Sequence, residues 1–456
     1  MTVSSPAASP DDESDVPRLF VGGDFVLPEP GGREVLAPGL RERVEGADLA
    51  MVNLEAPIDP DCDPIEKSGP AKASAAGTAD VLADFGVDAV TLANNHAMDY
   101  GAAGLRRTQR QCGRRGVATC GAGEDRDAAM EPHRADLDGT SVAVFSFCEQ
   151  EFGIADAGSA GTAWVSHPDA RQRVAAEAER SDVTVVVAHG GVEYVPFPPL
   201  SRQTQLRGFV EAGADIVVGH HPHVPQGWEV HQGTPIFYSL GNFRFEQPSR
   251  EKTDWGLALD LTIEDGEPTS VDLVPTEQRD GTVHEIDRDR ALDEQLQYLY
   301  RVTERTAQRE QLRAHWQETA ARLFEQRYTG WLRQGTGARL RDQIRDPGQH
   351  VSRDAAWDGD RQDEMLVLLN VLRNESHRAV IETALGLKTG ECEDVRTEEV
   401  RGTVRELVQW TEDRQLYDRP SPARANLGML ATRVSEWLPT LSDDTGSRAG
   451  GDSESV

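Results

Sequence analysis

Residues 215–224, DIVVGHHPHV, join a short apolar run to three histidines. The run has the length and the branched side chains that are typical of a buried β-strand. A second run at residues 183–188, VTVVVA, is followed in the same way by His189 and two glycines. Three histidines within four residues at a strand end are rarely core packing. The pattern therefore indicates a binding site at the ends of two buried strands.

Further apolar runs occur on both sides of these two, and stretches with helical spacing lie between many of them. Alternating strands and helices are typical of an α/β domain with a largely parallel sheet. Two runs at residues 257–262 and 270–274 flank a turn and predict a closing hairpin. The other expected strands are 19–23, 49–54, 88–93, 141–147 and 235–240, and the expected helices are 78–85, 101–115, 168–181 and 200–212.

The character of the sequence changes after residue 275. From about residue 289 onward, leucines and aromatic residues recur at three- and four-residue spacing, which predicts helices. We therefore expect an all-α second part. The predicted organisation is a disordered acidic tail (1–17), an α/β domain (18–275), a helical domain of unknown role (276–440) and a disordered tail (441–456), with the clearest later helices at 362–373, 376–386, 396–415 and 424–438.

Polar residues follow six of the predicted strands at the point where each run ends. In an open α/β sheet the carboxyl ends of parallel strands lie along one edge, and ligands bind there. Each motif alone is also common in turns and helix caps, but their joint order favours a divalent-metal site. Carboxylate, amide and imidazole donors suit Mn²⁺, Fe²⁺, Zn²⁺ or Mg²⁺. The candidate metal ligands are Asp24, Glu55, Asn95, His189, His221 and His223.

The composition is strongly acidic. The 456-residue chain has 47 basic and 78 acidic residues, a net charge of −31, and only four lysines. This balance argues against general nucleic-acid binding, which needs clustered basic residues. It is typical of proteins in molar salt, where carboxylate repulsion is screened, so we expect a halophile protein. No long apolar run, apolar leader or CxxC pair is present, which predicts a cytoplasmic protein without a transmembrane segment.

The motifs at the strand ends are Gly23-Asp24, Asn53-Leu54-Glu55, Asn94-Asn95-His96 with Asp99-Tyr100-Gly101, His189-Gly190-Gly191-Val192-Glu193-Tyr194, Gly219-His220-His221-Pro222-His223-Val224 and Ser239-Leu240-Gly241-Asn242-Phe243. Together they resemble the CapA family, capsule-synthesis proteins associated with bacterial poly-γ-glutamate. That family looks like a branch of the calcineurin-like metallophosphoesterase superfamily. The similarity covers about residues 18–275 and implies layered sheets, flanking helices and one or two divalent ions. The helical part resembles no family that we can name.

The resemblance implies roles for single residues. Glu55, or Asn53 as an alternative, matches the carboxylate that bridges two ions. The motif that begins at Asp24 places a histidine two residues later in the superfamily, but Val26 stands there, so one ion is short of a ligand. His96 matches the histidine that protonates the leaving group.

These roles predict a metal-dependent hydrolase in which metal-activated water cleaves a phosphoester or an amide during capsule or poly-γ-glutamate formation. Asp99 is expected to orient the proton-donating histidine. The residues expected to contact the substrate are Asn53, Asn94, Glu193, His220 and Asn242, with His220 at the rim of the site.

An alternative is a non-catalytic component that holds an anionic polymer, with the helical domain docked on a capsule-synthesis complex. Residues 276–456 carry a net charge of −8, against −23 for residues 1–275, and their arginines could pair with carboxylates. The expected partner in both cases is an anionic polymer or a phosphoester. Cys148 and the histidines away from the strand ends, including His377, are expected to take no part in the chemistry.

Overall fold

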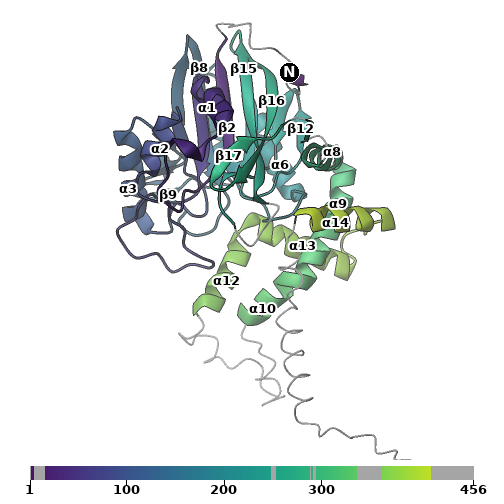
Figure 1. Ribbon diagram of the computed structural model, residues 1–456. Helices are drawn as coiled ribbons and strands as arrows, with labels where there is room; N and C mark the ends of the chain where they lie inside the picture. Colours follow the sequence, from purple (N-terminus) through teal and green to yellow (C-terminus); the bar gives the residue numbers. More distant parts are fainter. Residues whose placement is uncertain are drawn as a thin grey trace, which may run out of the picture.

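The computed structural model describes residues 2–4, 16–247, 253–287, 289–290, 294–335 and 362–411. Figure 1 shows two β-sheets that pack face to face, helices on their outer sides, and a group of helices at one end of the sheets. This is the predicted layered α/β arrangement followed by a helical part, so the predicted fold class is confirmed.

The larger sheet contains nine of the described strands. They are β1 (Thr2–Ser4), β2 (Arg18–Phe25), β3 (Leu49–Leu54), β4 (Ala89–Thr91), β5 (Ala118–Cys120), β14 (Asn242–Arg244), β15 (Trp255–Glu264), β16 (Glu267–Arg279) and β17 (Thr282–Glu285). β2 to β5 lie side by side and parallel, so their carboxyl ends meet at one edge. The predicted hairpin is present as antiparallel β15 and β16, which join the sheet beside β2.

The smaller sheet contains six described strands. In spatial order they are β12 (Trp228–His231), β13 (Thr234–Phe237), β11 (Ile216–His220), β10 (Val183–His189), β8 (Thr140–Cys148) and β7 (His133–Leu137). On β10, Val185 and Val187 belong to the core between the sheets, whereas Val186 packs on the outer side. Both faces of this strand are therefore buried, which explains its uninterrupted valine run.

Helices cover the outer face of each sheet (Figure 1). On the larger sheet, Leu40, Leu82 and Leu105 from three helices pack with Phe20 and Val52. α5 and α6 cover the smaller sheet in the same way. The elements of these layers are η1 (Arg33–Val35), α1 (Pro38–Glu45), α2 (Thr78–Asp84), α3 (Gly101–Arg114), α4 (Arg126–Ala129), α5 (Pro168–Ala178), α6 (Leu200–Val210) and a small ribbon of β6 (Ala122–Gly123) with β9 (Gly161–Thr162).

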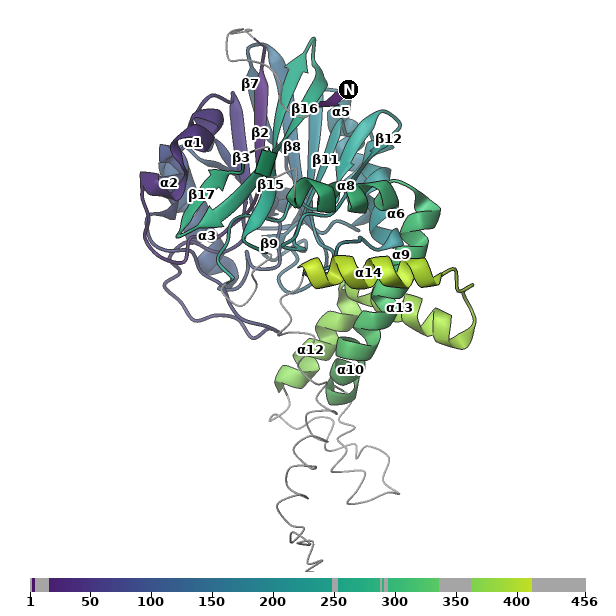
Figure 2. The same ribbon diagram turned by 45° about the vertical axis from the view of Figure 1, so that its right-hand side comes forward.

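The helical part lies on the side of α6 and extends beyond the strand ends (Figure 2). Its elements are α8 (Gln295–Thr306), α9 (Arg309–Leu323), the π-helical turn η3 (Phe324–Tyr328), α10 (Thr329–Gly335), α12 (Gln362–Arg373), α13 (Glu375–Thr389) and α14 (Glu398–Thr411). α9 and α13 both contact α6. Within the described ranges, no helix combines the length and the apolar character needed to cross a membrane.

The sheet does not end where the sequence predicted. The predicted boundary at residue 275 falls inside β16, and β17 adds a further strand, because the chain reverses at Asp280 and Gly281, which both have positive φ. β1, which lies in the predicted disordered tail, pairs with β16 at the sheet edge. The predicted helix at 424–438 and the tail at 441–456 lie outside the described residues.

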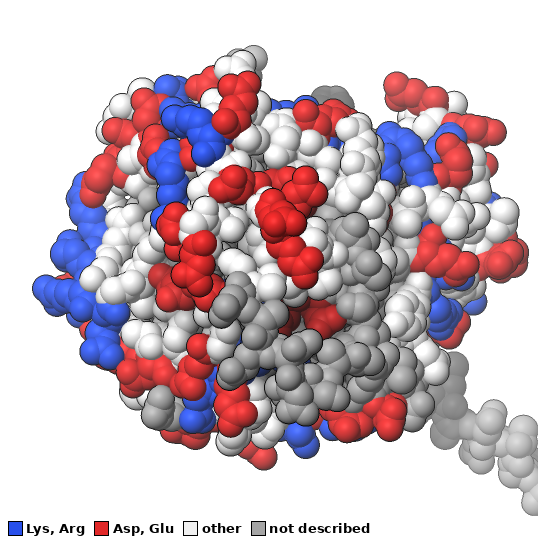
Figure 3. All heavy atoms as spheres, turned by 90° about the horizontal axis from the view of Figure 1, so that it is seen from above, with Lys and Arg blue, Asp and Glu red and all other residues white. Residues whose placement is uncertain are grey.

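Acidic side chains are prominent on the end of the molecule seen in Figure 3. Asp and Glu spread over the middle of this face, and many of the Lys and Arg side chains lie toward its margins. Such a surface needs hydration or counter-ions to limit carboxylate repulsion. Halophilic growth remains a prediction from the composition.

Replacing Trp316 by Ala is expected to lower the free energy of unfolding by about 3–5 kcal/mol. Trp316 is 1% exposed and packs with Val192 and Val195 from the α/β part, so its loss leaves a cavity where the two parts meet. Urea unfolding followed by far-ultraviolet circular dichroism at fixed salt measures the change. Tyr300→Ala is the control because Tyr300 is 47% exposed on α8. Equal stabilities of the two variants would contradict this packing.

Candidate metal centre

Residues from both sheets meet where the parallel strands end. Asp24 on β2 lies opposite Asn53 on β3, and His189 on β10 lies opposite His220 on β11. Glu55 follows β3 directly. Because the sheets pack face to face, the two rows of strand ends come together. The six predicted metal ligands are thereby brought into one region.

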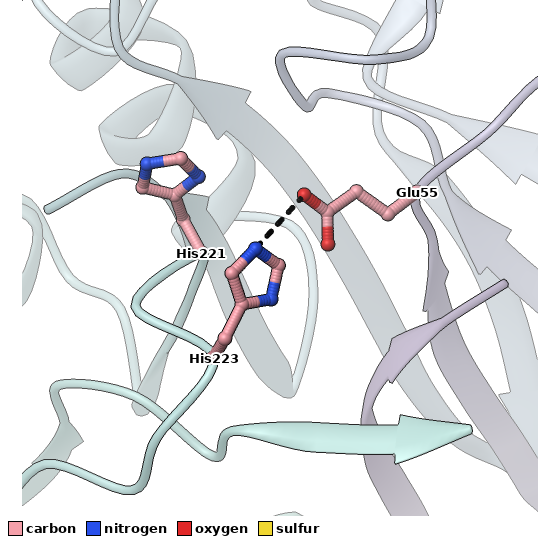
Figure 4. Close-up of side chains that lie close together, drawn as sticks. All are labelled: Glu55, His221 and His223. Carbon is pink, nitrogen blue, oxygen red and sulfur yellow. Dashed lines mark ion pairs between the residues drawn. The ribbon is translucent and has the colours of Figure 1, made fainter. Parts of the chain in front are cut away.

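A strained turn carries His221 and His223. Their φ angles are 99° and 58°, which residues other than glycine rarely adopt. Just before this turn, Gly219 packs so closely on Tyr238 that a Cβ atom would lie 2.1 Å from the Tyr238 carbonyl oxygen. Strain of this kind costs roughly 1–3 kcal/mol for each residue. Here it places both imidazole rings beside the carboxylate of Glu55 (Figure 4).

Three other possible metal ligands converge at the ring of His189. Its Nε2 lies 3.1 Å from Asn95 Oδ1, 3.1 Å from His221 Nδ1 and 3.5 Å from Glu55 Oε1. His223 approaches from another side, and its Nε2 lies 4.0 Å from Glu55 Oε1, the contact drawn in Figure 4. Glu55 is therefore common to two groups of possible ligands, Asp24–Glu55–His189 and Glu55–His221–His223, with ligand atoms within 4.8 Å of one another.

The carboxylate of Glu55 is fully buried, and neither of its oxygens has a hydrogen-bond partner among the described residues. Burial and the nearby Asp24 raise its pKa well above the usual value. Burial also lowers the pKa of His189, and lowers that of His221 to about 3, so both rings are neutral donors. An unpaired buried carboxylate is costly unless a cation compensates it. This charge and the donor set fit a divalent cation.

Asp24 forms the other side of the centre. Its Oδ1 accepts a 2.7 Å hydrogen bond from Asn53 and lies 3.3 Å from His220 Nδ1, and its Oδ2 lies 3.6 Å from His223 Nδ1. Burial raises the pKa of Asp24, but the hydrogen bonds and charges of its neighbours outweigh burial and lower it. His220 is 1% exposed, so its predicted place at the rim was wrong. β11 continues through this residue, and its side chain faces the core.

The position predicted to lack a ligand is apolar. Val26 packs with Ala56 and Phe245 in a small buried cluster, and the Phe245 ring lies 4.9 Å from that of His223. The Nζ of Lys72 lies 4.8 Å from the centre of the Phe245 ring. Apolar side chains thus occupy the position where the superfamily motif has a further histidine, and the ammonium group of Lys72 lies nearby.

A second polar group surrounds His96. Its Nδ1 lies 2.7 Å from Asp99 Oδ2, as predicted for an orienting carboxylate. Asp99 also pairs with Lys67 and accepts the backbone N–H of Lys72 at 2.7 Å. Burial and Lys67 lower the pKa of His96 to about 4, so its ring is neutral at pH 7. Because Nδ1 is held by Asp99, Nε2 is the ring nitrogen left for a substrate.

Two residues predicted to contact the substrate, Asn53 and Asn94, form a buried hydrogen-bonded chain behind the candidate ligands. Asn53 Nδ2 reaches both Asp24 and the Nδ1 of His189, the latter at 3.2 Å. Asn94 donates to Asn53 Oδ1 at 3.2 Å and to the Leu54 carbonyl at 2.9 Å. Both asparagines are 1% exposed. Their geometry suits them to hold ligand side chains in place.

Asn242 has the same kind of role. Its Oδ1 lies 3.0 Å from His223 Nδ1, and its Nδ2 donates to the Thr253 carbonyl at 2.9 Å. Glu193, by contrast, is half-buried, and its charge partly offsets the burial that lowers the pKa of His221. Of the residues predicted to bind substrate, Glu193 remains a candidate.

The helical part reaches this edge, which the sequence did not predict. Ser376, in the first turn of α13, donates its hydroxyl to Glu149 at 2.7 Å. The backbone N–H of Glu149 in turn donates to the His189 carbonyl at 2.9 Å. His377 was predicted to stand apart. Its Nδ1 lies 2.6 Å from the Tyr328 hydroxyl oxygen, and His377 contributes to lowering the pKa of His221. Its sequence surroundings are purely helical, so no local signal marked it.

Lys67 and Lys72 were also missed. Both lie in the segment between β3 and α2, which has no strand or helix periodicity. A compositional signal did exist, since these two residues are half of the four lysines in the chain. In a chain that otherwise uses arginine, two lysines five residues apart indicate a special local requirement.

The part of the chain that contains this candidate centre is similar to known proteins. Residues 23–247 match the family model described as bacterial capsule synthesis protein PGA_cap. The chain is 40% identical over 172 residues to the PGA biosynthesis protein CapA of Bacillus subtilis (strain 168), covering 37% of this chain and 45% of that protein. It is 32% identical over 211 residues to the capsule biosynthesis protein CapA of Bacillus anthracis, covering 45% and 51%.

The chain therefore spans about half the length of these two relatives. Among solved structures, it is similar to a hypothetical protein from Thermus thermophilus with a TM-score of 0.39 and 19% sequence identity. That similarity covers 57% of this chain and 100% of the other.

Proposed function

Because residues 23–247 belong to the bacterial capsule synthesis protein family PGA_cap, we propose that this protein is a metal-dependent hydrolase in the biosynthesis of an anionic capsule polymer. The bond it cleaves is a phosphoester or an amide of the polymer or of a precursor. The polymer class follows from relatives such as the PGA biosynthesis protein CapA. The cytoplasmic location stays a prediction from the sequence.

One observation carries the proposal. Glu55 is a fully buried carboxylate with no hydrogen-bond partner among the described residues, and three imidazoles surround it. A purely structural cluster would satisfy such a group with hydrogen bonds or a basic side chain. A cation therefore accounts best for its burial.

The side chains of Glu55, Asn95, His189 and His221 would hold one ion, because their donor atoms approach one another most closely. When bound, such an ion supplies Lewis-acid chemistry. The side that includes Asp24 has Val26 in place of a histidine, so we propose that one ion is held firmly and any second ion weakly.

His96 would exchange a proton with the reacting oxygen or nitrogen through Nε2. Asp99 fixes the ring by binding Nδ1, and Lys67 fixes Asp99. Lys67 also donates to the Asn95 carbonyl at 3.1 Å, which ties this group to the ligand set. This contact links the proposed proton carrier to the proposed ligand set.

A turnover assay tests the proposal. Protein purified in molar KCl is loaded with Mn²⁺ and offered p-nitrophenyl phosphate mono- and diesters and poly-γ-glutamate. We expect hydrolysis of at least one of them, read as nitrophenolate absorbance or polymer shortening, and its loss after chelation. Folded, manganese-loaded protein that cleaves none of these substrates would rule out the proposed hydrolase.

A further inference from the structure

A cavity of about 780 Å³ lies between the helices of the smaller sheet and the helical part. Residues of α5 and α6 line one part of it, and Arg309 of α9 and residues of α13 line another. Glu149 also lines it, and Glu149 is bonded through its backbone to His189. The cavity and the metal centre therefore adjoin the same end of β10, but different side chains form them.

Four helices begin at this cavity. Pro168, Leu200, Arg309 and Glu375 are the first residues of α5, α6, α9 and α13, and all four line it. The first turn of a helix has backbone N–H groups without intrahelical partners and carries a positive partial charge. Among the described residues, no side chain caps the amino ends of α6 and α9. Their first N–H groups can therefore serve an anionic ligand.

Arginines add full positive charges to these helix ends. Arg171 and Arg378 line the cavity, are exposed, and form no ion pair with any described residue. Arg309 also lines it and donates to the side-chain oxygen of Gln203 at 3.1 Å. In a chain with 78 acidic residues, three arginines without a carboxylate partner around one cavity are unexpected.

A fourth arginine is buried there. Arg202 lines the cavity, is 2% exposed, and donates from Nη2 to the Ala188 carbonyl at 2.6 Å and from Nη1 to Gln205 at 2.7 Å. Its Nε has no hydrogen-bond partner among the described residues. A buried donor left unpaired is costly, and an acceptor on a ligand would satisfy it.

Two of the acidic residues that line the cavity are bound elsewhere. Glu375 accepts the backbone N–H of Gln150 at 2.9 Å and the indole N–H of Trp164 at 2.6 Å. Glu149 accepts the hydroxyl of Ser376 and forms a long ion pair with Arg202, at 3.8 Å. Neither carboxylate pairs with Arg171, Arg309 or Arg378, so these three guanidinium groups are available to a ligand.

We propose that this cavity binds a ligand with two or more negative groups, carboxylates or phosphates. Arginine forks bind either group in a bidentate manner, and several forks around one space favour several anionic groups over a single small ion. The volume suits a small molecule or a short segment of a polymer. The site is separate from the metal centre and does not depend on hydrolase activity.

Isothermal titration calorimetry of the full chain tests this inference. The probes are a γ-linked tetraglutamate and inorganic tripolyphosphate, both at the lowest KCl concentration that keeps the protein folded. The test variant is the double substitution Arg171→Ala with Arg378→Ala, which removes two exposed side chains. The control is Arg110→Ala, an exposed arginine on α3 that also forms no ion pair with a described residue.

We expect at least one probe to bind, the double variant to bind it at least about 10-fold more weakly, and the control to match the unaltered protein. Tetraglutamate alone would identify a carboxylate ligand, and tripolyphosphate alone would identify a phosphate ligand. Manganese content should be unchanged in the double variant, which separates this site from the metal centre. Failure of both probes to bind, or an equal loss in the control, would overturn the inference.

Discussion

Glu55→Gln protein is expected to bind Mn²⁺ roughly 100-fold more weakly than the unaltered protein, or worse. Glu55 is common to both groups of possible ligands, and the amide has no negative charge to offer a cation. Metal analysis after dialysis against a manganese buffer measures the change. Glu42→Gln, an exposed substitution on α1, should retain its metal.

The same substitution should act in the opposite direction when no metal is present. In chelator, the Glu55→Gln variant is expected to be more stable than the unaltered protein by roughly 1–3 kcal/mol, because the raised pKa of the buried Glu55 carboxyl means that either its charge or its protonation costs folding free energy. Thermal unfolding at fixed KCl, with and without Mn²⁺, compares the two. A variant that keeps its manganese, or that loses stability in chelator, would contradict the assignment of Glu55 as a cation ligand.

His96→Ala is expected to lower the rate of hydrolysis by about 10²–10⁴-fold with little change in manganese content. His96 binds Asp99 and Lys67 and lies beside the ligand set without belonging to it. The measurement is the turnover number on whichever substrate the manganese-loaded protein cleaves. His284→Ala, on β17 at the edge of the larger sheet, is the matched histidine control.

The two functional hypotheses diverge in this experiment. If the His96→Ala variant hydrolyses the substrate at the rate of the unaltered protein, His96 carries no proton in the reaction. The non-catalytic role, in which the metal centre only holds an anionic polymer, is favoured instead if the unaltered, manganese-loaded protein hydrolyses none of the substrates. A large loss of activity with full metal content supports the hydrolase.

Much of the fold was predictable because buried parallel strands have a simple signature. The valine run of β10 is uninterrupted because both faces of this central strand are covered. The convergence of the six candidate ligands was predictable for a related reason, since they follow parallel strands, although these strands belong to two facing sheets and not to one edge. The order of the motifs along the chain and their positions at strand ends were sufficient for this prediction, without any knowledge of side-chain contacts.

Side-chain direction at the end of β11 was not predictable. The sequence His220-His221-Pro222 does not show at which residue side chains stop alternating between the two faces of the strand. The structure places His220 inside because the strand includes it, and the positive φ of His221 then redirects the chain. A positive φ can be anticipated at a glycine, but a histidine in the sequence gives no sign that its φ is positive.

Long-range contacts with the helical part were equally hidden. Ser376 and Glu149 are 227 positions apart, and neither lies in a motif. The hydrogen bond exists because α13 begins beside the end of β8, a consequence of how α9 and α13 pack on α6. Helical periodicity predicts that a helix has a buried face, but not which surface covers it.

The anchoring of His223 has a consequence for the order of assembly. His223 is held by Asn242, and Asn242 is held by the carbonyl of Thr253. Asn242 also lies opposite Asp24 in the register of β14 and β2. During synthesis, the ribosome makes Asp24 roughly two hundred residues before it makes Asn242 and Thr253. A nascent chain that has not yet reached Thr253 cannot complete this pocket, so we expect the proposed ion to bind only after the larger sheet has closed.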